Sequence, residues 1–108
     1  MNNPNELVPV NERDAKELTD TIVEVEAYRE LYDQALREPD YSPNALKDLL
    51  DRFMQALKTH KALWRDLLFQ YVGEENALYY RDYYRFDTYK QVIFLQQPEE
   101  VGYELSGN

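Results

Sequence analysis

Four acidic residues stand in pairs whose spacing suits metal binding. Glu30 and Asp33 form one pair and Asp48 and Asp51 the other, and in each pair the second acid follows three residues after the first. Residues three apart lie on one face of a helix, so each pair directs two carboxylates to the same side. Carboxylate oxygens are ligands that Mg²⁺ prefers, and a bound Mg²⁺ stabilises the charge of a transferring phosphate.

These pairs resemble the acidic pairs that all-α nucleotide pyrophosphohydrolases use to hold Mg²⁺. The resemblance covers only the four acids and implies a Mg²⁺-dependent hydrolase. Both pairs, however, fall opposite the predicted apolar stripes of their helices, whereas a phosphate site needs carboxylates that converge in a cleft. A solvated charged face therefore explains the pairs better. We predict no metal site and no cofactor.

His60 is the only histidine and takes a core-facing position in the second predicted helix. The Glu-x-x-His pair of carboxylate-bridged bundles is absent, so a hydrogen-bonded or boundary histidine is favoured over a metal ligand or a catalytic base. Serine occurs only at Ser42 and Ser106, cysteine is absent, and the three glycines at positions 73, 102 and 107 cannot form a phosphate-binding loop. We therefore predict no catalytic residues, and a protein that is not an enzyme.

Tyrosine is concentrated towards the end of the chain. Six of the ten tyrosines are Tyr71, Tyr79, Tyr80, Tyr83, Tyr84 and Tyr89. If this stretch is helical, one set of aromatic residues faces the rest of the protein: Tyr79, Tyr83, Phe86 and Tyr89. Tyr80 and Tyr84 then project away from the core together with Arg81 and Arg85.

Exposed tyrosine and arginine are enriched in the hot spots of protein interfaces. We therefore predict an interaction surface formed by Tyr80, Arg81, Tyr84 and Arg85, with Trp64 supporting it from below. Two other interpretations remain. The tyrosines pack with their hydroxyls at the rim and the arginines pair with acids such as Asp82, or the cluster forms an aromatic and cationic cradle for a nucleotide or single-stranded nucleic acid.

Two long amphipathic helices are predicted to position these residues. Asn11 is a plausible N-cap, and a helix over 12–38 follows, which Pro39 ends. Its apolar face is Leu18, Ile22, Val25, Tyr28, Tyr32, Ala35 and Leu36. Ser42 and Pro43 begin a second helix over 43–72, which Gly73 ends. Its apolar face is Leu46, Leu49, Leu50, Phe53, Leu57, Leu63, Trp64, Leu67 and Tyr71. The short connection predicts an antiparallel hairpin.

The third stretch fits two structures. Aromatic and apolar residues at steps of three and four favour a helix over 75–97, broken near Asp87 and Thr88. The β-branched and aromatic residues of 89–95 also fit a strand, whose partner would be 7–10 or another subunit. We predict flexible tails at 1–10 and 98–108, around a single helical domain over 11–97.

The chain is acidic, with 21 acids, 12 bases and a net charge of −9. Residues 1–42 hold eleven acids and four bases, whereas 43–72 hold three acids and five bases, so these two parts should attract each other. The acidic balance disfavours direct binding of nucleic acid or of anionic membranes. The absence of cysteine, of a signal peptide and of an apolar run long enough to span a bilayer makes the cytoplasm the expected compartment.

The predicted fold class is all-α, an antiparallel hairpin of two long helices with a third C-terminal helix that is broken or partly extended. The expected function is protein–protein interaction by a small acidic adaptor, assembly factor, chaperone-like subunit or inhibitor that forms homo-oligomers. An alternative is an acidic protein that mimics nucleic acid and inhibits a DNA-binding protein, although Lys16, Arg29 and Arg37 interrupt its acidic stripe. A Mg²⁺-dependent nucleotide pyrophosphohydrolase is the less favoured alternative.

Overall fold

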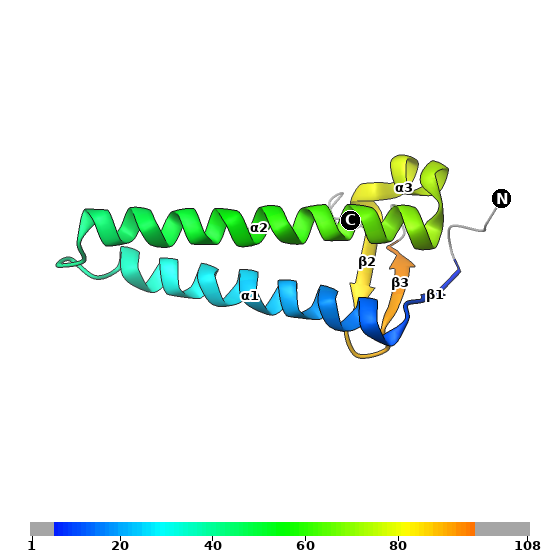
Figure 1. Cartoon of the computed structure of the whole chain (residues 1–108), viewed down its shortest axis with the longest axis horizontal. Helices are drawn as coiled ribbons and strands as arrows, with labels where there is room; N and C mark the ends of the chain where they lie inside the picture. Colours follow the sequence, from blue (N-terminus) through cyan, green and yellow to red (C-terminus); the bar gives the residue numbers. More distant parts are fainter. Residues whose placement is uncertain (1–5, 97–108) are drawn as a thin grey trace, which may run out of the picture. The chain divides into compact units, whose positions relative to one another are not determined.

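The computed structural model describes residues 6–96 and is mostly helical (Figure 1). The chain divides into two compact units. The hairpin unit is Lys16–Trp64, and the described part of the other, here called the sheet unit, is residues 6–15 and 65–96. The predicted tail over 98–108 lies outside the described residues.

The two long helices are α1 (Glu12–Leu36) and α2 (Pro43–Val72). At the start of α1 the Asn11 side-chain oxygen accepts a 2.8 Å hydrogen bond from the Asp14 backbone N–H, which confirms Asn11 as the N-cap. The Ser42 hydroxyl accepts a longer bond of 3.5 Å from the Ala45 N–H at the start of α2. Both predicted helix starts are therefore confirmed, and α1 ends two residues earlier than predicted.

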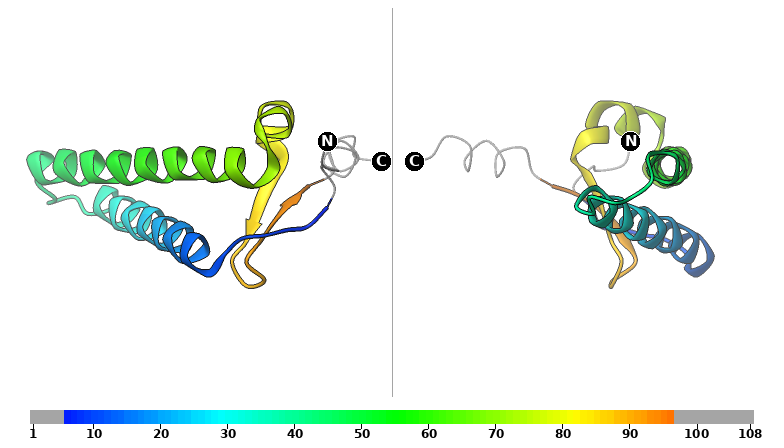
Figure 2. Two further views of the ribbon diagram at one scale, coloured as in Figure 1. Left: turned by 45° about the vertical axis from the view of Figure 1, so that its right-hand side comes forward. Right: turned by 90° about the vertical axis from the view of Figure 1, so that its left-hand side faces the viewer.

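In the hairpin unit, α1 and α2 lie side by side and antiparallel (Figures 1 and 2). Leu18, Val25 and Ala35 of the predicted α1 face are buried, whereas Leu36 is exposed. The predicted α2 residues from Leu46 to Trp64 are all half-buried, because a single facing helix covers only part of each side chain. Tyr32 stacks on Phe53 across the seam, with ring centroids 6.4 Å apart.

The sheet unit contains a three-stranded antiparallel sheet of β1 (Val8–Pro9), β2 (Tyr84–Asp87) and β3 (Val92–Leu95). The strand order is β1-β3-β2, with Val8 paired to Ile93 and Phe86 paired to the same residue from the other side. The strand interpretation was therefore correct for 92–95 and for its partner segment 7–10, whereas 89–91 form a turn and the second partner, β2, was not predicted. The prediction of a flexible tail over 1–10 was wrong for its described end, since Val8–Pro9 is a strand and Val10 is buried.

The helix predicted over 75–97 is limited to α3 (Glu74–Tyr80), followed by one 3₁₀ turn, η1 (Arg81–Tyr83). Gly73 separates α3 from α2 with φ +87° and ψ 153°, a conformation that is essentially restricted to glycine. After η1 the chain forms the β2–β3 hairpin, whose turn is held by Asp87. Its Oδ1 accepts hydrogen bonds of 2.8 and 2.9 Å from the N–H groups of Tyr89 and Lys90. The predicted hairpin of two long helices with a third C-terminal helix is thus confirmed, although the third helix is shorter than predicted and the chain continues into strands.

Within residues 6–96, no helix combines the length and the apolar character needed to cross a bilayer.

Candidate interaction surface

Tyr80 and Arg81 lie at the end of α3 and the start of η1. Tyr80 is half-buried, and its ring lies 5.4 Å from that of Tyr79. Arg81 is exposed, and its Nε lies 3.8 Å from a carboxylate oxygen of the adjacent Asp82. A contact this long between exposed neighbours constrains the guanidinium weakly, so Arg81 remains accessible to a partner.

Tyr84 does not project from the protein as predicted. It is the first residue of β2, pairs with Leu95, and is 2 % exposed. Its hydroxyl is buried and has no hydrogen-bond partner within the described residues, and burial raises the pKa of this hydroxyl. The prediction assumed helical spacing, whereas a strand alternates its side chains between two faces and directs Tyr84 to the core.

Arg85 is exposed as predicted, but its guanidinium is occupied by backbone groups. Nη1 donates hydrogen bonds of 2.8 Å to the Asp82 carbonyl and 2.9 Å to the Tyr84 carbonyl. The strand order places β2 at an edge of the sheet, where unpaired carbonyls invite pairing with another strand. Arg85 therefore covers part of this edge.

Trp64 is half-buried at the end of the hairpin unit. Tyr80 belongs to the sheet unit, so the expected support of Tyr80 by Trp64 stays a prediction.

The side chains that α3 does expose form a different set. Leu78 is 62 % exposed and Tyr79 is 80 % exposed, whereas Asn76 and Ala77 are buried. The exposed Leu78 and Tyr79, together with Tyr80 and Arg81, form what we call the α3 patch. The prediction that Tyr79 faces the core was wrong. The sequence did contain a signal for the exposure of Tyr79. Glu75, which is exposed, precedes Leu78 and Tyr79 by three and four residues and therefore lies on the same side of the helix.

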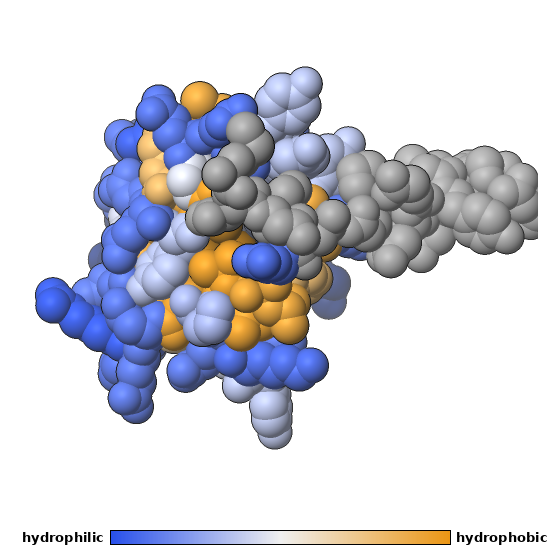
Figure 3. All heavy atoms as spheres, turned by 90° about the vertical axis from the view of Figure 1, so that its right-hand side faces the viewer, coloured by the Kyte–Doolittle hydropathy of each residue, from blue (hydrophilic) through white to orange (hydrophobic). Residues whose placement is uncertain are grey.

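One side of the sheet also carries apolar residues. Pro9, Val92 and Phe94 alternate with the core-facing Val8 and Ile93, so they lie on the opposite side of the sheet. Val92 and Phe94 are half-buried and Pro9 is exposed. Figure 3 shows apolar side chains gathered among hydrophilic ones on the face that it views.

Tyr71 links two segments of the sheet unit that are distant in sequence. Its hydroxyl donates a 2.7 Å hydrogen bond to Asp14 and accepts one of 3.1 Å from the Asn11 backbone N–H. Burial is the main cause of the raised pKa of this hydroxyl. A hollow of about 190 Å³ beside it is lined by Glu6, Leu7, Val8, Pro9, Tyr71, Val72, Asn76 and Tyr84. This volume is smaller than the roughly 300 Å³ at which ligand pockets begin.

The acids and the histidine that suggested chemistry are placed as follows. Glu30, Asp33 and Asp51 are exposed. Asp48 forms an ion pair with Arg52, in which Arg52 Nε lies 3.1 Å from Asp48 Oδ2. Among residues 6–96 no three metal-ligating side chains gather into a group. His60 is half-buried, as the boundary interpretation predicted, and burial lowers its pKa.

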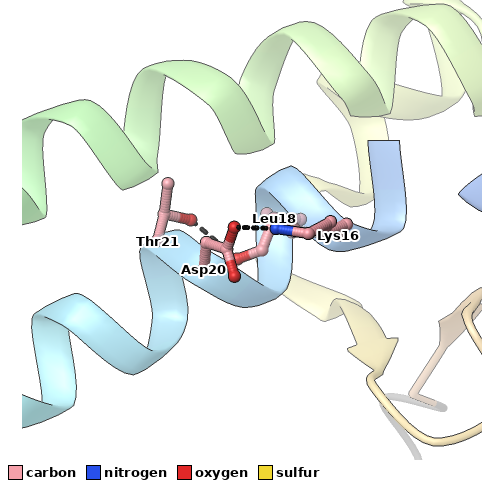
Figure 4. A network of polar contacts seen from close by, with 4 residues as sticks. All are labelled: Lys16, Leu18, Asp20 and Thr21. Carbon is pink, nitrogen blue, oxygen red and sulfur yellow. Dashed lines mark hydrogen bonds and ion pairs between the residues drawn. The ribbon is translucent and has the colours of Figure 1, made fainter. Parts of the chain in front are cut away.

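The imidazole ring of His60 in α2 contacts the Thr21 hydroxyl in α1. Its Nδ1 lies 2.9 Å from the Thr21 hydroxyl oxygen. That hydroxyl donates its one hydrogen to the Leu18 carbonyl at 2.7 Å (Figure 4). The tautomer that satisfies both contacts is protonated at Nδ1, which then donates to the Thr21 hydroxyl. His60 thus has a structural partner across the α1–α2 seam.

No family model, curated protein or solved structure matches this chain.

Proposed function

We propose that this chain is a protein–protein interaction module: a small acidic adaptor, assembly factor, chaperone-like subunit or inhibitor without catalytic activity. The exposure of the α3 patch is the observation that supports this function best. The proposal includes self-association and a cytoplasmic location, the latter suggested by the absence of cysteine.

The α3 patch has the composition of an interface hot spot. Leu78 and Tyr79 expose most of their surface on a helix that buries only two of its own residues. Tyrosine offers a large contact area with few rotatable bonds, and Arg81 adds directional hydrogen bonds next to it. Truncation of a hot-spot residue costs about 2 kcal/mol or more, which corresponds to roughly a thirtyfold loss of affinity.

The proposed role of α1 is selectivity. Its exposed acids would direct the encounter with a basic partner and repel acidic ones, which changes association rates more than affinity.

Two tyrosines allow a matched test of the α3 patch. Tyr79→Ala should lower partner capture from a lysate of the native host about thirtyfold, with circular dichroism unchanged. Tyr89→Ala is the control, because Tyr89 is 98 % exposed but lies in the β2–β3 turn and not in the α3 patch. If both variants capture partners as the wild type does, the α3 patch is not the contact surface.

The acids of α1 support a second candidate, mimicry of nucleic acid. Seven of them are exposed along the helix: Glu12, Glu17, Asp20, Glu24, Glu26, Glu30 and Asp33. A protein that inhibits a DNA-binding partner in this way should lose binding steeply as salt rises, since the contact consists of charge. Binding through the α3 patch should change little over the same salt range.

A further inference from the structure

The hairpin unit carries a second exposed surface, on the side of α2 that bears Met54. A hollow of about 440 Å³, which we call the α2 hollow, is lined by Asp51, Met54, Gln55, Leu57, Lys58 and Lys61. Met54 is 54 % exposed, and within residues 6–96 neither lysine forms an ion pair. This surface therefore combines apolar area with two lysines and a single acid, Asp51, so its net charge is positive.

The outer side of α1 carries the complementary chemistry. Val23 and Leu31 are 58 % and 50 % exposed, and Ala27 lies between them at steps of four residues. These steps align the three on one side of the helix, which we call the outer α1 face. Three exposed acids flank it: Asp20, Glu24 and Glu30. Of these, only Asp20 forms an ion pair within the described residues, with Lys16 at 2.9 Å (Figure 4).

The two surfaces cannot meet within one chain. Val25 is buried in the seam of the hairpin unit, and Val23 lies two residues earlier. Two helical residues are about 200° around the axis, so the outer α1 face points away from the seam and from α2 of the same chain. Any contact between this face and the α2 hollow therefore requires another molecule.

We infer that the chain self-associates by seating the outer α1 face of one copy in the α2 hollow of a second copy. This contact rests on the self-association contained in the proposed function and identifies its surfaces. Residues 16–36 hold six acids and two bases, and 43–64 hold four bases and two acids, so unlike surfaces attract and like surfaces repel. Val23 and Leu31 would cover Met54 and Leu57.

Because the contact joins two different surfaces, it is heterologous. A pair joined in this way keeps one free α2 hollow on one copy and one free outer α1 face on the other, so the association continues head to tail or closes into a ring.

Charge exchange tests the contact on the full chain. For the wild type, sedimentation velocity should give an apparent mass above the monomer value of 12.9 kDa. This apparent mass should rise with protein concentration and fall as the salt concentration rises. Lys58→Glu with Lys61→Glu should weaken association at least about tenfold, as should Glu24→Lys with Glu30→Lys, because each change opposes like charges. The chain that carries all four changes should associate again, because its outer α1 face is then basic and its α2 hollow acidic.

A matched control has the same charge change elsewhere. Arg37→Glu with Lys90→Glu also replaces two exposed bases by acids, but it leaves both surfaces unaltered and should associate like the wild type. A wild-type chain that stays monomeric, reversal variants that associate normally, or a fourfold variant that is not restored would each overturn the inference.

The self-contact and the function can fail separately. If Tyr79→Ala removes self-association and the lysine reversal does not, the self-contact belongs to the α3 patch. That result overturns the inference and leaves the proposed interaction function intact.

Discussion

The hairpin unit and the sheet unit use similar amino acids but bury them to different extents. Among residues 6–96, eight buried apolar residues belong to the sheet unit and four to the hairpin unit, and two of those four are alanines. The fully buried large side chains of the sheet unit, Leu68 and Ile93, come from distant parts of the chain. In the hairpin unit, α1 and α2 are neighbours in sequence and share one seam, whose large α2 side chains are half-buried.

The length of its helices therefore does not determine how much apolar surface a unit buries. A pair of helices leaves many seam residues partly in contact with water, whereas a helix end packed with a sheet is covered from several directions. We expect the amide hydrogens of the hairpin unit to exchange faster than those of β3. A bound partner would therefore stabilise the hairpin unit more than the sheet unit.

The largest expected effect compares two leucine truncations. Leu68→Ala should lower the free energy of unfolding by about 2–5 kcal/mol, because Leu68 is fully buried and leaves a cavity. Leu57→Ala, in the half-buried seam, should cost clearly less because solvent already reaches the side chain. Urea unfolding followed by circular dichroism measures both variants. Equal losses would break the comparison between the units.

Gly73 tests the joint between α2 and α3. Gly73→Ala should destabilise the sheet unit by about 1–3 kcal/mol through backbone strain. The strain comes from φ alone, since a Cβ at this position would meet nothing within 4 Å. Hydrogen exchange should show the loss of protection in α3 and β2 before the hairpin unit changes. Glu74→Ala, one residue later in α3, is the control and should leave exchange near the wild-type level.

Two tyrosines sharpen the comparison within the sheet unit. Tyr71→Phe removes hydrogen bonds to Asp14 and Asn11 and should cost about 1–2 kcal/mol. Tyr84→Phe removes a buried hydroxyl without a described partner and should raise stability by up to about 1 kcal/mol. Thermal unfolding of the two variants reports both values. A Tyr84→Phe chain less stable than the wild type would show that the hydroxyl has a partner.

The smallest effect is the pH response of the hairpin unit. Burial lowers the pKa of His60 below the 6.5 of an unfolded chain, so the unfolded state binds more protons in the window below that pH. The stability associated with neutral His60 is therefore complete above pH 6.5 and is lost as the pH falls through its folded pKa. The slope of unfolding free energy against pH should be shallower in His60→Gln. An identical slope in the variant would assign the acid response to other groups.

The helical part of the fold could be predicted because its signals are local. Asn11, Ser42 with Pro43, and Gly73 mark helix ends through groups within a few residues, and apolar steps of three and four define the seam. The candidate surface could be predicted only in part. Arg81 and Arg85 are exposed as predicted, but the orientation of Tyr84 depended on whether 81–95 is helix or strand.

Composition and periodicity alone therefore determined that this is an acidic chain with an antiparallel helical hairpin, begun and ended at identifiable residues. Tertiary structure decided the rest. Residues 84–95 pair as strands because Val8 and Pro9 reach β3 from the other end of the chain and complete the sheet. A pairing between segments more than eighty residues apart leaves only a weak trace in either segment, so the burial of Tyr84 followed from the fold and not from local sequence.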